Sequence, residues 1–149
     1  MKLKKTSITN YRCFKEAEID FDEHTTLIVG KNGAGKTAIL DAVAVAISTF
    51  LLGIDGGVSR SISKDDARYE FYDLDGTVDP QHQFPVSIES TGDCLDNHDV
   101  KWVRSLNSES GNTTVKEARE LTNISKNTQK RIMTGDKSLI LPLISYYGT

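Results

Sequence analysis

Three features of the sequence predict an α/β fold. Two runs of alternating apolar and polar residues lie near the N-terminus, a glycine-rich loop follows a short β-branched segment, and an apolar helical pattern begins directly after that loop. The chain has 149 residues, the length of one domain, and its 38% hydrophobic content is enough to form a core. We therefore expect one α/β domain with an incomplete sheet, in three parts that cover residues 1–54, 55–111 and 112–149.

The first part should contain a hairpin, a strand and a helix. Residues 2–9 and 14–21 alternate with a period of two, which predicts two antiparallel strands joined by a turn. Residues 25–29 are β-branched and uncharged, which predicts a central strand buried on both faces. From Ala38 the apolar residues recur with helical spacing. The hairpin should therefore flank a central strand that leads through the loop into a buried helix.

The second part is strongly acidic. Residues 65–99 carry ten acidic side chains and one basic side chain, which predicts an acidic loop interrupted by short strands. The best strand candidates are 85–89 and 100–106. Trp102 and the aromatic residues at 69, 71 and 72 have the chemistry to stack on bases, but their acidic surroundings favour a packing role.

The third part should contribute a helix and an apolar strand. Residues 114–133 have apolar positions at helical spacing, weakened by several Asn, Ser and Thr residues, and Gly135 follows as a stop. Residues 139–146 are strongly apolar, which predicts a strand. Pro142 lies inside this segment and indicates a bulge or an edge position.

Composition narrows the class of protein. The net charge of −3 argues against a surface that binds nucleic acid over its whole extent. The two cysteines, Cys13 and Cys94, exclude a disulfide scaffold and favour a reducing compartment. The chain opens without a secretion signal, and the apolar stretch 38–54 contains Asp41, so we interpret it as a buried helix and not as a membrane span. We expect a cytoplasmic protein with no membrane partner.

The glycine-rich loop carries the recognisable chemistry. It fits the pattern G-x-x-x-x-G-K-[ST], and its predicted context of strand, loop and helix is the one that this pattern requires. Its backbone N–H groups should line a nest for phosphate oxygens, its lysine should reach the β- and γ-phosphates, and the Thr37 hydroxyl should hold Mg²⁺. We therefore predict a site for MgATP or MgGTP formed by Gly30, Lys31, Asn32, Gly33, Ala34, Gly35, Lys36 and Thr37.

Hydrolysis needs more than this loop. A metal-binding carboxylate and a group that orients water are required, and such a carboxylate usually ends an apolar strand. The nearest candidate after Thr37 is the weak run 86–89, which ends in Glu89. Two interpretations stay open: the chain is the front part of a longer ATPase, or it is a non-hydrolysing nucleotide-binding interaction module that a partner chain completes.

The first 45 residues resemble the N-terminal segment of RecF/SMC-like ATPases, which have ABC-type heads. The resemblance rests on the hairpin with its Asn10-Tyr11-Arg12 turn, on the Walker A sequence with Asn32, and on the Leu40-Asp41-Ala42 helix start. Segments 61–68 and 141–149 are also similar to bacterial AAA-family ATP-binding proteins of the virulence and phage-defence (Septu, retron) type.

This resemblance implies an MgATP-binding lobe of an ATPase in DNA metabolism or repair, or in anti-phage defence. Arg12 would lean toward the phosphates, the alternative being an exposed turn residue, and Ser63 and Asp66 lie where such heads often touch the base or ribose. The Walker B and signature motifs of the family have no counterpart in this sequence. ATP hydrolysis, homodimerisation, and contacts with DNA or an effector protein are therefore expected only of an intact protein that continues beyond residue 149.

Overall fold

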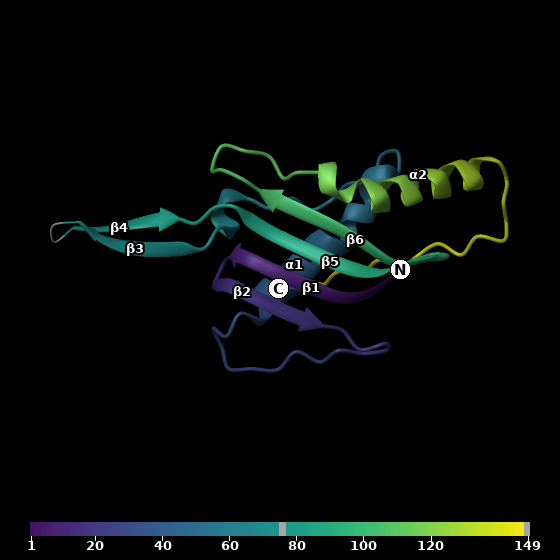
Figure 1. Ribbon diagram of the computed structural model, residues 1–149. Coiled ribbons are helices and arrows are strands. Elements are labelled where there is room, and N and C mark those ends of the chain that lie inside the picture. Colours follow the sequence, from purple (N-terminus) through teal and green to yellow (C-terminus); the bar gives the residue numbers. More distant parts are fainter. Residues whose placement is uncertain (75–76, 148–149) are drawn as a thin grey trace.

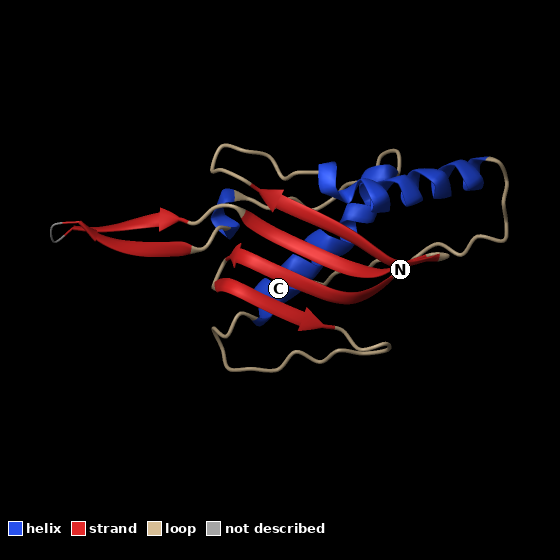
Figure 2. Ribbon diagram, in the orientation of Figure 1, coloured by secondary structure: helices blue, strands red, loops and turns tan. Residues whose placement is uncertain are grey.

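The computed structural model describes residues 1–74 and 77–147. Gly148 and Thr149, the last residues of the segment that resembles AAA-family proteins, lie outside this part. A four-stranded antiparallel sheet has the order β2-β1-β5-β6, and a helix crosses one of its faces (Figures 1 and 2). The α/β class predicted from the sequence is confirmed.

The predicted N-terminal hairpin is confirmed. Strand β1 (Lys2–Tyr11) pairs with β2 (Phe14–Asp20) in a register that places Lys5 opposite Asp20 and Tyr11 opposite Phe14. Only Arg12 and Cys13 lie between the two strands, and Arg12 has a positive φ of 52°. The turn is therefore tight, with one of its two residues in the left-handed region.

The second part of the chain is more ordered than the predicted acidic loop. Strands β5 (Val86–Cys94) and β6 (Asn97–Leu106) are longer than the segments 85–89 and 100–106, and β5 is an inner strand of the sheet. The alternation of β5 is hidden in the sequence because small polar residues occupy inward positions. The buried Ser90 hydroxyl, for example, hydrogen bonds to the hydroxyl of Thr6 on β1 at 3.0 Å.

Helix α1 (Lys36–Ser48) forms the core with the sheet and continues into a 3-10 turn at Thr49–Gly53. Ala42, Val45 and Ala46 are fully buried, and the buried Trp102 of β6 donates its indole N–H to the Ala46 carbonyl at 3.0 Å. By length and composition alone, 36–53 could cross a membrane. Here its inner face packs on the sheet, in agreement with the predicted buried helix.

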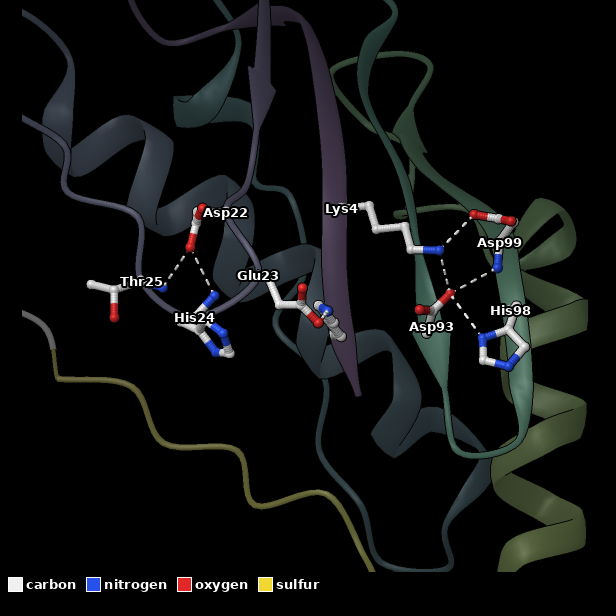
Figure 3. A network of polar contacts seen from close by, with 9 residues as sticks. Lys4, Asp22, Glu23, His24, Thr25, Asp93, His98 and Asp99 are labelled. Carbon is white, nitrogen blue, oxygen red and sulfur yellow. Dashed lines mark hydrogen bonds and ion pairs between the residues drawn. The ribbon is translucent and has the colours of Figure 1, made fainter.

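The predicted central strand at 25–29 is wrong. This segment has no strand structure, and Leu27 and Val29 are 81% and 77% exposed. The Asp22 carboxylate accepts hydrogen bonds from the backbone N–H groups of His24 and Thr25, which turns the chain at the point where the strand would begin (Figure 3). Within residues 1–74 and 77–147, no neighbouring strand supplies the ladder that a strand requires.

The predicted apolar strand at 139–146 is also wrong. The segment leaves helix α2 (Arg119–Met133) and runs back toward α1 without pairing to any described strand (Figure 1). Leu143 is 94% exposed. High apolar content gave this segment strand propensity, but propensity alone does not form a strand without a hydrogen-bonding partner. The predicted helix at 114–133 is confirmed, with its first residues forming a 3-10 turn at Lys116–Ala118.

A second hairpin, β3 (Tyr69–Leu74) and β4 (Thr77–His82), projects from the body of the molecule (Figure 1). The prediction that its aromatic residues pack is wrong for Phe71, which is 72% exposed. Tyr69 and Tyr72 are half-exposed, and the Tyr69 ring makes a tilted contact with the His82 ring. The same prediction is confirmed for Trp102, which is buried in the core.

Candidate nucleotide-binding site

The glycine-rich loop has the backbone of an anion nest. Gly33 and Gly35 have φ values of 83° and 89°, in the left-handed region that favours glycine. Gly35 is also the N-cap residue of α1, whose first residues are Lys36 and Thr37. The positive end of the helix dipole and its free N–H groups therefore face the same space as the loop.

Lys36 is held at the centre of the loop. Its ammonium group donates hydrogen bonds to the carbonyl oxygens of Gly30 and Lys31, both at 2.8 Å. A charged donor in the middle of a backbone nest is the arrangement that binds phosphate oxygens. Thr37 is exposed at the second position of α1, which suits a hydroxyl that contacts a hydrated cation.

The β1–β2 turn closes one side of the site. The loop, the start of α1 and this turn line a cavity of about 460 Å³. The turn is in close contact with the loop, because a Cβ built on Gly35 would lie 2.5 Å from the Phe14 ring and 2.7 Å from the Cys13 sulfur. The lining residues are Arg12, Cys13, Asn32, Gly33, Gly35, Lys36, Thr37 and Ala38.

The structure brings Arg12 to the cavity and fixes its guanidinium between two carboxylates. Its Nη1 lies 2.5 Å from Oδ2 of Asp41, and its Nε lies 2.9 Å from Oδ1 of Asp66. Burial would lower the pKa of Arg12, but its hydrogen bond with Asp66 and the nearby negative charges raise it. The predicted alternative, a freely exposed turn residue, does not describe this arginine.

Ser63 and Asp66 lie behind Arg12 and do not line the cavity. The Asp66 carboxylate accepts hydrogen bonds from the backbone N–H and the hydroxyl of Ser63, which caps a short 3-10 turn at Lys64–Asp66. The backbone N–H of Arg12 also donates to the Asp66 carbonyl at 2.7 Å. Asp66 thus ties the loop at 61–68 to the β1–β2 turn.

Sequence reasoning missed Asp41 as a site residue. Its carboxylate is 6% exposed and also contacts Arg60 at 2.9 Å and the Tyr146 hydroxyl at 2.5 Å. Burial would raise the pKa of Asp41, but the Tyr146 hydrogen bond and the arginines outweigh burial and lower it. The available signal was an acidic residue within an otherwise apolar helical pattern, because a buried carboxylate requires partners.

The described residues fit the polyphosphate of a nucleotide better than they fit a complete catalytic centre. The loop has no room for a side chain at Gly35, and Lys36 of the loop and Arg12 of the β1–β2 turn line the same cavity. The residues that line this cavity include no carboxylate. Glu89, the nearest candidate for a metal-binding carboxylate, is exposed on β5 and is not among them.

The fold and the loop define an α/β protein of the P-loop NTPase type, in which an antiparallel hairpin and a helix flank the loop. Family comparison agrees, since residues 5–149 match the AAA domain family. The chain belongs to this AAA domain family.

Known proteins with similar sequences include several RecF proteins and a Rad50 ATPase. The chain is 54% identical over 43 residues to the DNA replication and repair protein RecF of Flavobacterium johnsoniae, which covers 29% of this chain and 12% of RecF. It is 48% identical over 44 residues to the DNA double-strand break repair Rad50 ATPase of Archaeoglobus fulgidus, covering 30% of this chain and 5% of Rad50. RecF of Actinobacillus pleuropneumoniae is 32% identical over 100 residues, covering 64% of this chain and 26% of RecF.

The fold also matches a solved structure from work on ATP-driven dimerization and DNA-stimulated activation of SMC ATPases. The TM-score is 0.52 at 20% identity, with 84% of this chain and 80% of that chain covered. The resemblance to RecF/SMC-like ATPases is confirmed, whereas the narrower likeness to Septu and retron proteins stays a prediction. The chain spans about a quarter or less of the length of the curated relatives described above.

Proposed function

We propose that this chain is the MgATP-binding N-terminal lobe of a RecF/SMC-like ATPase that acts in DNA metabolism or repair. The observation that carries the proposal is the loop at the N-terminus of α1, with Lys36 at its centre and Arg12 at its rim, around one cavity. The RecF and Rad50 relatives, a DNA replication and repair protein and a DNA double-strand break repair ATPase, support a role in DNA repair. Anti-phage defence is the narrower alternative that the resemblance of segments 61–68 and 141–149 suggests.

Each part of the loop has a proposed role. The amides of Gly30, Lys31, Asn32, Gly33, Ala34 and Gly35 and the Lys36 ammonium hold phosphates, the Thr37 hydroxyl is a ligand of Mg²⁺, and Arg12 contacts the phosphates from the turn. Ser63 and Asp66 support Arg12 in this proposal, since they lie behind it. Mg²⁺ would supply charge neutralisation between the phosphates.

Hydrolysis belongs to the intact protein in this proposal. The residues that line the cavity provide no metal-binding carboxylate, so we propose that a region beyond residue 149 supplies it, together with contacts to DNA and to an effector protein. Homodimerisation on ATP is proposed for that intact, cytoplasmic protein only. The alternative is an interaction module that binds nucleotide without hydrolysis and that a partner chain completes.

Calorimetric titration of the chain with MgATP and with MgGTP tests the site. We expect Lys36→Ala to weaken nucleotide binding by about 10- to 100-fold, because it removes a charge-assisted contact worth roughly 1.5–3 kcal/mol. Lys101→Ala is the matched control, since Lys101 is exposed on β6 and does not line the cavity. A folded chain that gives no heat with either nucleotide would contradict the proposal.

A second measurement separates the ATPase from the interaction module. The Lys36→Ala change is introduced into the intact protein, and partner-dependent activity is compared with nucleotide affinity. Loss of both nucleotide affinity and partner-dependent activity supports the ATPase interpretation. Loss of affinity with unchanged partner activity supports the module.

A further inference from the structure

The Arg12 side chain needs a partner that fixes its direction. An arginine side chain has several rotatable bonds, and at a turn it would otherwise sample many orientations at an entropic cost to any ligand that it binds. Here the shortest contacts of the guanidinium are made by Nε with Asp66 and by Nη1 with Asp41. Arg12 is still 32% exposed and lines the cavity, so it is fixed without being removed from the site.

Asp41 is well placed to fix it. This residue lies on α1 about one turn after Lys36 and Thr37, so it belongs to the same rigid element as the phosphate loop's last residues. Its Oδ2 contacts Arg12, while its Oδ1 forms an ion pair with Arg60 at 2.9 Å and accepts a hydrogen bond from the Tyr146 hydroxyl at 2.5 Å. Arg60 also lies over the Tyr146 ring at 5.4 Å. Arg60 and Tyr146 therefore hold the carboxylate at Oδ1, and Oδ2 stays directed at Arg12.

We propose that Asp41 is a positioning residue, which holds the Arg12 guanidinium at the phosphate loop while Arg60 and Tyr146 hold the carboxylate itself. This inference rests on the proposed nucleotide-binding function. It assigns the apolar C-terminal segment a part in the site, because Tyr146 comes from that segment and lies 105 positions from Asp41 in the sequence. Removing the Asp41 charge should weaken nucleotide binding only as long as Arg12 is present.

A double-mutant cycle tests the proposal. MgATP and MgADP affinities are measured for the wild-type chain, Asp41→Asn, Arg12→Ala and the double variant. We expect Asp41→Asn to weaken MgATP binding by about 3- to 10-fold, the effect of misplacing one charged contact, and to have less than a twofold effect in the Arg12→Ala background. Asp41→Glu, which keeps the carboxylate, should recover most of the affinity.

The matched control is Asp93→Asn. Asp93 is another ion-paired carboxylate, and its partner is Lys4 (Figure 3). Lys4 lies near the start of β1, whereas Arg12 directly follows the end of that strand. MgATP affinity should stay unchanged in this variant. If Asp41→Asn does not fold, Tyr146→Phe replaces it in the cycle, because it removes only the hydroxyl that holds the carboxylate. Its loss of affinity should be smaller and should again disappear without Arg12.

The outcomes separate the inference from the function on which it rests. Equal losses with and without Arg12, or no loss in either variant, overturn the positioning role while the Lys36-dependent binding stands. A wild-type chain that does not bind MgATP overturns both. Loss that depends on Arg12 and recovers in Asp41→Glu supports the inference, since a merely structural role would give additive effects.

Discussion

At the scale of single residues, the site depends on a close contact between loop and turn. Gly35 has a positive φ of 89°, and its α-carbon faces the Phe14 ring and the Cys13 sulfur. Gly33 has a similar φ of 83° but nothing within 4 Å of where a Cβ would lie. Both positions thus require a residue that tolerates a positive φ, and only position 35 also lacks the space for a side chain.

This difference predicts unequal costs for alanine. Gly33→Ala should lower the free energy of unfolding by about 1 kcal/mol, the cost of a left-handed non-glycine residue. Gly35→Ala should cost about 2–4 kcal/mol, since overpacking against Phe14 adds to that strain. Urea unfolding of both variants checks this. Equal costs would show that Phe14 and Cys13 can move aside to accommodate the added methyl group.

The residues of the loop could be predicted because their chemistry is local. The motif places glycines, lysine and threonine within eight consecutive positions, and five of these positions, Asn32, Gly33, Gly35, Lys36 and Thr37, line one cavity. Asp41 could have been suspected as a charge in an apolar helix. Tyr146 and Arg60 could not, because their contacts with Asp41 depend on the path of the chain after α2 and after α1.

At the scale of elements, the reliable predictions are those in which both partners of a pairing are visible in the sequence. The β1–β2 hairpin alternates on both strands and was predicted with nearly correct ends. Segments 25–29 and 139–146 have strand composition, yet neither pairs within residues 1–74 and 77–147. Apolar composition shows that a segment could be buried as a strand, but a strand also needs a neighbouring strand to hydrogen bond with.

The end of the sheet near Lys4 gives a prediction on pH. The Lys4 ammonium contacts Asp93 at 2.7 Å and Asp99 at 2.8 Å (Figure 3). The hydrogen bond from Lys4 to the Asp93 carboxylate, and a second one from the backbone N–H of Asp99, lower the pKa of Asp93 from 3.8 to about 2. A lowered pKa stabilises the folded chain above the unfolded-state value, and this stability is lost as the pH falls from about 4 through 2.

Asp93→Asn should therefore make the stability of the chain less dependent on pH over this interval. Denaturant unfolding at pH 4.5, 3.5 and 2.5 measures how the free energy of unfolding changes with pH. Asp96→Asn is the control, because Asp96 is exposed and forms no ion pair with the described residues. A slope in Asp93→Asn equal to that of the wild type would contradict the assignment.

At the scale of the whole molecule, the described chain has a packed core and two exposed apolar segments, 25–29 and 139–146, that pair with no described strand. The core lies between α1, the sheet and α2, where Val45, Ile88 and Leu121 are fully buried. The two apolar segments that were predicted as strands lie outside it, with Leu27 81% and Leu143 94% exposed. Single exposed apolar residues are ordinary, and each of these segments leaves two or more of them uncovered by the described residues.

Leucine-to-serine changes should distinguish the core from these two segments. Leu27→Ser and Leu143→Ser should each change the free energy of unfolding of this chain by less than about 0.5 kcal/mol, as surface substitutions do. Leu121→Ser, the buried control on α2, should cost about 3 kcal/mol or more. Should either exposed-site variant match the buried control, the segment in question is packed in solution.

The hydrogen bonds of Lys36 affect how any lysine substitution in the loop is interpreted. The ammonium joins the carbonyls of Gly30 and Lys31, so it is a crosslink within the loop as well as a contact for a ligand. An arriving phosphate exchanges with those carbonyl oxygens as acceptor, and truncating the side chain removes the crosslink and the contact together. The affinity lost in Lys36→Ala is therefore an upper bound on the lysine–phosphate interaction, because part of it measures the loosening of the loop.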